Sequence, residues 1–209
     1  MAIQISTDTE LSAVNSILGS IGQSPITSLT ASGGVDPLAN PEISFVKNIL
    51  DEANKDIQTC GWHFNSEYGV KLSPNSNGHY LVPVNAILFD ISDGQIDRGT
   101  DVVRRNGKLF DTIHQTDVFT QDYSFDIVSL LPFDDVPPAI QRYIIARASV
   151  RAATQLVSNA DLVKLLSTQE EMTKANAYEY ETQQGDHNFM GFPSESRYRA
   201  YQPYKAIIR

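Results

Sequence analysis

The segment from Asn40 to Asn65, NPEISFVKNILDEANKDIQTCGWHFN, organises the rest of the chain. Its apolar residues recur at alternating intervals of three and four positions, which predicts a helix with a single apolar stripe. Asn40 is a good N-cap, Pro41 suits the first helical position, and Gly61 is the kind of residue that ends a helix. We therefore expect a core helix here. Its stripe consists of Ile43, Val46, Leu50, Ala53, Ile57 and Cys60.

Two aromatic residues follow the glycine directly. Trp62 is the only tryptophan of the chain, and Phe64 lies two positions further on. In an extended segment, side chains two positions apart point to the same side. We expect Trp62 and Phe64 to be buried together where the helical and β parts of the chain join.

Size and charge disfavour some classes of function. The chain has 209 residues and 41% hydrophobic content, which is enough for a core in one fair-sized domain or two small ones. Its formal charge of −9 makes it a poor general binder of nucleic acid backbones, because like charges repel. A DNA-binding module is therefore disfavoured, although an acidic protein can line a passage for DNA.

The single cysteine and the lack of long apolar runs bear on the compartment. Cys60 alone cannot form an internal disulfide, and within the apolar stripe we expect it to be a small buried hydrophobe. No apolar run approaches the ~20 residues of a membrane span, and the N-terminus lacks a basic region followed by an apolar core. We expect a soluble protein made in a reducing compartment, without membrane association or a cleaved export signal.

Three further helices are predicted, one before and two after a region without helical periodicity. The first begins at Thr9-Glu10 and is closed by Gly22. The third follows the acidic residues and prolines of 134–138, which make a strong helix start. The fourth follows Ser158-Asn-Ala-Asp161, a sequence that resembles a capping box, and ends at Gly185.

Residues 66–132 contain short apolar runs between Gly, Pro, Asn and Asp, which is typical of β structure. The clearest hairpin is the segment 104–110, in which Asn106 and Gly107 suit a turn whose two central residues have positive φ. We expect an antiparallel sheet or sandwich of about five or six strands. We also expect the tip at Arg105, Asn106 and Gly107 to reach out toward a partner. Further strand candidates are 68–72, 80–82, 86–89, 118–119 and 125–131.

The last segment, 186–209, has no useful periodicity but is rich in aromatic and basic residues. A solvated disordered tail rarely holds so many aromatic residues, and Tyr and Arg favour interfaces. We therefore expect an arm that docks on another surface rather than a floppy tail. Its candidate interface residues are Phe189, Phe192, Arg197, Tyr198, Arg199, Tyr201 and Tyr204.

These patterns together predict an α+β protein. About four helices from both chain ends, in 1–65 and 133–185, form a helical bundle. An antiparallel β domain, 66–132, is inserted into it, and 186–209 is an extended C-terminal arm.

No combination of residues calls for catalysis, a cofactor or a metal. His63, His79, His114 and His187 are scattered without metal-ligand spacing, and no phosphate-binding glycine motif is present. Acidic pairs such as those at 134–135 and 170–171 leave open an alternative function, a carboxylate-dependent glycan hydrolase. Acids at a helix start are more often caps, and acids within a helix are more often a solvated face.

Three segments together resemble the tail tubular protein A family of short-tailed bacteriophages. They are Glu10–Gly22 (ELSAVNSILGSIG), Ile57–Asn65 with its Gly-Trp-x-Phe-Asn pattern, and Asp134–Pro137 followed by Tyr143–Ser149. The long helix with Glu170-Glu171 and the Tyr178-Glu-Tyr180 segment also match, so the resemblance covers most of the chain.

The resemblance implies a structural virion protein rather than an enzyme. Members of the family are head-to-tail adaptors that form a ring, dodecameric in this family, between the portal protein and the tail nozzle protein. The helical part is then expected to dock on the portal and the sheet part to face the nozzle. DNA would pass through the lumen without sequence-specific binding. The protein would be synthesised in the host cytoplasm and reside at the head–tail junction of the virion.

Overall fold

The computed structural model describes residues 8–29, 40–92 and 99–185. Its contacts divide these residues into two compact units. The helical unit runs to Cys60 and resumes over Leu131–Thr182, and the β unit contains Gly61–Leu130. Four α-helices and five strands in antiparallel sheets make the fold α+β, as the sequence predicted. No helix within the described ranges is both long and apolar enough to span a membrane.

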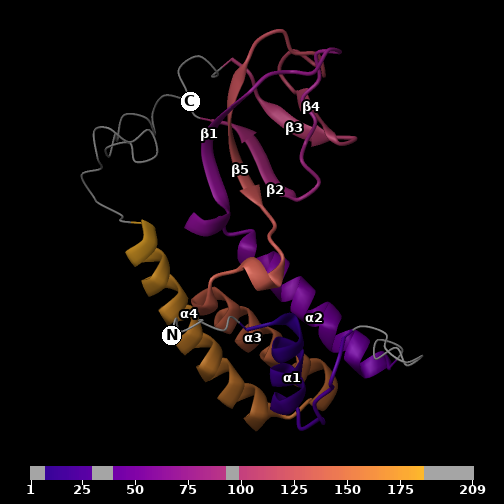
Figure 1. Ribbon diagram of the computed structural model, residues 1–209, viewed down its shortest axis with the longest axis vertical. Coiled ribbons are helices and arrows are strands. Elements are labelled where there is room, and N and C mark those ends of the chain that lie inside the picture. Colours follow the sequence, from indigo (N-terminus) through magenta and orange to yellow (C-terminus); the bar gives the residue numbers. More distant parts are fainter. Residues whose placement is uncertain (1–7, 30–39, 93–98, 186–209) are drawn as a thin grey trace, which may run out of the picture. The chain divides into compact units, whose positions relative to one another are not determined.

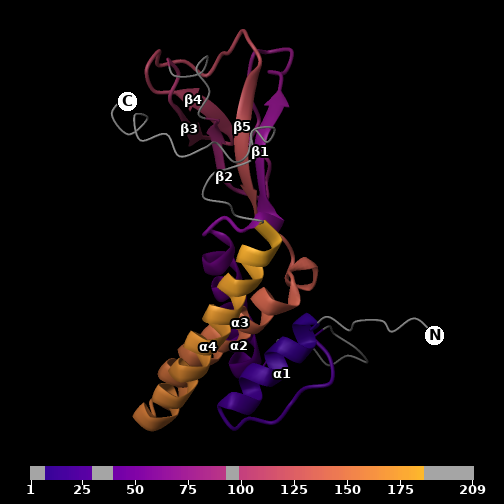
Figure 2. The same cartoon turned by 90° about the vertical axis from the view of Figure 1, so that its left-hand side faces the viewer.

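In the helical unit, three helices pack against one another and surround a common core. Figures 1 and 2 show α1, α2 and α3 lying together. The central helix, α3, contributes buried residues on much of its circumference, including the fully buried Ile140 and Ile144. The helices are α1 (Glu10–Ser20), α2 (Pro41–Gln58), α3 (Pro138–Ala152) and α4 (Ala160–Gly185).

The start of α2 is as predicted. The side chain of Asn40 accepts a hydrogen bond from the N–H of Glu42 at 3.0 Å, and Pro41 occupies the first helical position. The stripe is buried at Val46, Leu50 and Ala53, and α2 packs against α1 and α3. An N-cap and a 3.6-residue period therefore act together to fix this helix.

The end of α2 differs from the prediction. The helix stops at Gln58, and Thr59 is its C-cap, while Gly61 adopts the left-handed conformation with φ 73°. Cys60 is therefore beyond the helix, and it is exposed rather than buried. The apolar stripe ends one turn earlier than periodicity alone indicated, because the chain changes direction before Cys60 can face the core.

The junction of α3 and α4 also differs in detail. A π-helical segment, Ala153–Val157, continues α3 and ends at Ser158, which is left-handed with φ 55°. The cap of α4 is Asn159, whose side chain accepts from the N–H of Asp161 at 3.0 Å. Ser158 therefore ends one helical segment instead of beginning the next, and the predicted capping box is wrong by one residue.

The β unit contains two antiparallel sheets. The order in the larger sheet is β1-β5-β2, with β5 in the centre, and β3 and β4 form a hairpin (Figure 1). Residues 80–82 and 118–119 are not strands, although Leu81 makes an isolated bridge to Lys108. The strands are β1 (Ser66–Leu72), β2 (Ala86–Ile91), β3 (Val102–Arg105), β4 (Lys108–Asp111) and β5 (Tyr123–Ser129).

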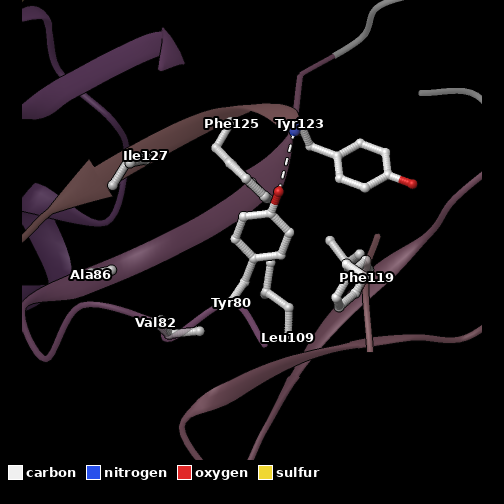
Figure 3. Close-up of a cluster of buried hydrophobic side chains, with 9 residues drawn as sticks. Tyr80, Val82, Ala86, Leu109, Phe119, Tyr123, Phe125 and Ile127 are labelled. Atoms are coloured by element: carbon white, nitrogen blue, oxygen red, sulfur yellow. Dashed lines mark hydrogen bonds between the residues drawn. The ribbon is translucent and has the colours of Figure 1, made fainter. Parts of the chain in front are cut away.

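A cluster of buried side chains fills the β unit, and Tyr80 lies within it. Its ring lies 4.9 Å from that of Phe125 and 5.2 Å from that of Phe119, both edge to face. Figure 3 shows the Tyr80 hydroxyl pointing at the N–H of Tyr123, from which it accepts a hydrogen bond at 3.3 Å. Edge-to-face rings with a satisfied hydroxyl favour one arrangement of this core. The other members are Val82, Ala86, Val102, Leu109 and Ile127.

The two aromatic residues after Gly61 have different environments. Trp62 is buried, with 3% of its surface exposed, as predicted, whereas Phe64 is only half-buried. Residues 63–65 form a short 3₁₀ turn, so the two side chains do not share one side of an extended segment. Asn65 holds this turn, because its side chain accepts from the N–H of Trp62 and donates to the carbonyl of Ser129.

Candidate partner surface

The β3–β4 turn has the geometry that its sequence predicts. Asn106 has φ 50° and Gly107 has φ 74°, so both central residues are left-handed, as a two-residue hairpin of the primed type requires. Arg105 pairs with Lys108 across the turn. All three predicted interface residues of the hairpin, Arg105, Asn106 and Gly107, are exposed.

Backbone hydrogen bonds join the exposed turn to the segment 80–82, and the expectation that its tip reaches toward a partner stays a prediction. The N–H of Val82 donates to the carbonyl of Gly107 at 3.0 Å, and the N–H of Leu109 donates to the carbonyl of Tyr80 at 3.1 Å. The segment around Leu81 therefore supplies hydrogen-bond partners to backbone groups along one edge of β4. An open strand edge would leave these backbone groups without partners, and its closure ties the turn to the β unit.

The hairpin has an inner and an outer face. Val102 and Leu109 point inward and belong to the buried cluster. Because side chains alternate along a strand and paired residues share a face, their neighbours point outward. We define the hairpin outer face as Leu81, Val103, Arg105, Lys108 and Phe110.

The hairpin outer face combines cations with apolar side chains. The guanidinium of Arg105 lies 4.1 Å from the centre of the Phe110 ring, a cation–π contact. Lys108 is a more distant partner of Asp117, with 3.7 Å between Nζ and Oδ2. Arg104 pairs with Leu109, so it lies on the other face of the hairpin, and its side chain donates to the carbonyl of Ala86. Arrangements of this kind suit recognition of an anionic, partly apolar surface.

A buried carboxylate stabilises the far end of the hairpin. Asp111 accepts from the N–H of Ile113 at 2.8 Å, and its other oxygen lies 2.6 Å from Nδ1 of His114. Burial alone raises the pKa of Asp111, but hydrogen bonds from the His114 ring and from two backbone N–H groups outweigh it, so the pKa lies below its ordinary value. The contacts show a carboxylate that holds a turn.

The histidines that the structure describes are not gathered into a metal site. Among the described residues, no group of three or more His, Cys, Asp or Glu side chains is placed to hold a metal ion. His79 interacts through Nδ1 with the carbonyl of Asp117, and His114 interacts with Asp111. His187 lies outside the described residues.

The acidic pairs that left open a hydrolase are engaged in structural contacts. Asp134 accepts a hydrogen bond from the N–H of Glu10 at 3.0 Å and so caps α1. Glu170 forms an ion pair with Arg147 at 3.3 Å. One carboxylate of each pair is therefore held in a structural contact, and the hydrolase alternative is not favoured.

The predicted interface residues of the C-terminal arm lie outside the described residues. They are Phe189, Phe192, Arg197, Tyr198, Arg199, Tyr201 and Tyr204.

Sequence reasoning identified the turn but missed its outer face. A signal existed for Val103 and Phe110, because the turn at Asn106-Gly107 sets the register and alternation then separates the two faces. Leu81 carried no such signal. Its bridge to Lys108 joins segments that lie far apart in the sequence, and only the folded chain brings them together.

Comparisons with known proteins give one consistent result. The family model described as tail tubular protein matches residues 11–187, which include the helices, both sheets and the hairpin. Tail tubular protein A of Klebsiella phage KP34 is 27% identical over 128 residues, covering 61% of this chain. The matched part spans 62% of that relative's length, which is less than two thirds.

Proposed function

Because this chain belongs to the tail tubular protein family and is a structural component of a phage tail, we propose that it is the head-to-tail adaptor of its virion. In this proposal, identical subunits form a ring between the portal protein and the tail nozzle protein, and DNA passes through the lumen. The ring has twelve subunits by family resemblance.

The observation that carries the proposal is the extent of the family match. It runs over 11–187 and so includes both the helical unit and the β unit. A match confined to one unit would suggest a shared module only. A subunit with two different units offers two different surfaces, which suits an adaptor between two different neighbours. We assign the helical unit to the portal and the β unit to the nozzle, as the family resemblance implies.

The surface of α4 supports assembly with other subunits. Leu165, Met172 and Tyr178 have 61%, 63% and 50% of their surfaces exposed on this one helix. Exposed large apolar side chains commonly become buried on association. Rings of identical subunits use head-to-tail contacts, in which one surface always meets a different one.

The charge of the chain supports passage of DNA without tight binding. The net charge is −9, and an acidic lumen repels phosphate groups. A repelled duplex slides along the passage instead of adhering to it. In this proposal, DNA therefore passes through the ring without sequence-specific binding.

A nonsense mutation in the gene for this chain tests the proposed role. Infected cells should then accumulate DNA-filled heads without tails, visible by electron microscopy, and a plasmid copy of the gene should restore tailed particles. The nozzle protein should be absent from the purified heads. Tailed particles that lack this chain would contradict the proposal.

A further inference from the structure

We propose that the hairpin outer face binds a carboxylate-bearing surface of a second copy of this chain, with Arg105 as its central contact. The inference rests on the proposed ring, and it names one of the two surfaces that meet between neighbouring subunits.

The arginines of the two units differ in their partners. In the helical unit, Arg142, Arg147 and Arg151 each form an ion pair, with Asp8, Glu170 and Asp56 respectively. In the described part of the β unit, Arg104 and Arg105 form no ion pair with a carboxylate. The chain has 25 acidic residues and 16 Lys and Arg residues, so acids are plentiful. An arginine without a carboxylate in such a chain is available to an anion from outside.

Arg105 is also held in place before any partner arrives. Its guanidinium lies over the Phe110 ring at 4.1 Å, and the strand pairs Arg105 with Lys108 across a tight turn. The turn itself is fixed by the hydrogen bond from Val82 to Gly107. A side chain that is already ordered loses less conformational entropy on binding, and Arg stacked on an aromatic ring is typical of residues that dominate interface energies.

The neighbours of Arg105 favour a protein partner over DNA. Leu81 and Val103 have 62% and 37% of their surfaces exposed, and Phe110 is half-buried. Contacts to a phosphate backbone come from basic and polar groups, and exposed apolar side chains add nothing to them. In protein interfaces, by contrast, apolar and aromatic side chains surround Arg in the buried centre.

A second copy of the chain is the partner whose chemistry fits. Its surface carries the surplus of acids, and α4 exposes both acidic and apolar side chains, such as Glu171 and Met172. The hairpin outer face has the opposite charge and similar apolar content, so the two kinds of surface complement each other. A contact between unlike surfaces has the head-to-tail form that a closed ring needs.

Sedimentation velocity of the full-length chain over a range of concentrations tests the inference. We expect the wild type to self-associate, and more weakly at high salt. Arg105→Glu should weaken self-association by at least about tenfold. Arg105→Lys keeps the charge but loses the planar stacking, and it should give a smaller loss. The matched control is Lys71→Glu, an equal charge change at an exposed residue of β1 in the other sheet, which should change self-association by less than about threefold.

The outcomes separate this inference from the proposed ring. If the wild type forms rings and Arg105→Glu forms them equally well, the inference is wrong and the ring stands. If the wild type never associates, with itself or on portal, both fail. Equal weakening by Lys71→Glu would show a general charge effect and overturn the inference. The inference would also be overturned if Arg105→Glu lost binding to DNA or to the portal but kept its self-association. Circular dichroism checks folding, and Arg105→Gln replaces any variant that does not fold.

Discussion

The side-chain amide of Gln58 pairs with both backbone groups of Leu131, 73 residues further along the chain. Its Nε2 donates to the carbonyl of Leu131 at 2.9 Å, and its Oε1 accepts from the N–H of Leu131 at 2.8 Å. Gln58 is the last residue of α2 and is fully buried, and Leu131 is where the chain re-enters the helical unit. One side chain therefore joins the departing and returning segments of the chain.

Replacement of Gln58 should destabilise the helical unit. Gln58→Ala removes the partners of two backbone groups of Leu131, and we expect the free energy of unfolding to fall by about 2–4 kcal/mol. Urea denaturation followed by circular dichroism measures the change. Gln169→Ala, at an exposed position of α4, is the matched control and should change stability by less than about 0.5 kcal/mol. Equal midpoints for the wild type and Gln58→Ala would contradict the pairing.

Truncation of Trp62 should be among the most destabilising single changes. The side chain is buried, so Trp62→Ala should cost about 3–5 kcal/mol from lost burial and the cavity left behind. Phe64→Ala should cost clearly less, because Phe64 is only half-buried. Thermal unfolding by circular dichroism suits both variants, since Trp62 is the only tryptophan and its fluorescence is lost on replacement. An unchanged melting temperature for Trp62→Ala would refute its role in the core.

Two glycines with the same backbone conformation should respond differently to alanine. At Gly107, φ is 74° and an added Cβ meets no atom within 4 Å, so only backbone strain of about 1 kcal/mol is expected. At Gly78, φ is 78° and the Cβ would lie 2.7 Å from Cγ1 of Val118, so the clash adds to the strain and about 2–4 kcal/mol is expected. Chemical denaturation of both variants gives the comparison. Equal losses would show that space around Gly78 is not limiting.

The contribution of Asp111 to stability should depend on pH. Its pKa in the folded chain is lowered, so the carboxylate form is favoured by folding. This contribution is fully present above the unfolded pKa of about 3.9 and is lost as the pH falls through the folded value. The stability difference between the wild type and Asp111→Asn should therefore be largest above about pH 5 and shrink in more acidic solution. Asp122→Asn makes the same change at an exposed position and serves as the control for the loss of one negative charge.

Removal of the residues after Gly185 should impair assembly rather than folding. All buried residues that the structure describes come before this segment, so we expect the shortened chain to keep near-native helix content and melting behaviour. The segment carries Phe189, Phe192, Tyr198, Tyr201 and Tyr204, aromatic residues that anchor well in partner pockets. Portal binding or ring formation should therefore weaken. Aggregation of the shortened chain would place the segment in the subunit's own core, and unimpaired assembly would make it dispensable.

Local signals were sufficient for the elements themselves. The stripe and caps of α2 and the Asn106-Gly107 turn depend on neighbours within a few residues, and their conformational preferences act before any distant contact forms. Local reasoning failed where two signals competed over one or two positions. Ser158 and Asn159 are both good caps, but the π-helical continuation of α3 ends at Ser158, and Asn159 is the cap of α4.

By itself, the sequence determined the α+β class, the core of α2 and the β3–β4 turn, because each follows from short-range periodicity and backbone preference. The tertiary structure alone decided which distant segments meet: Gln58 with Leu131, and Leu81 with Lys108. Buried backbone groups must find partners wherever the chain brings one within reach, and that requirement leaves no pattern along the sequence. The pairing of Leu81 with Lys108 also fixes how the hairpin lies against the β core. It leaves the opposite side, with Arg105 over Phe110, exposed to a partner.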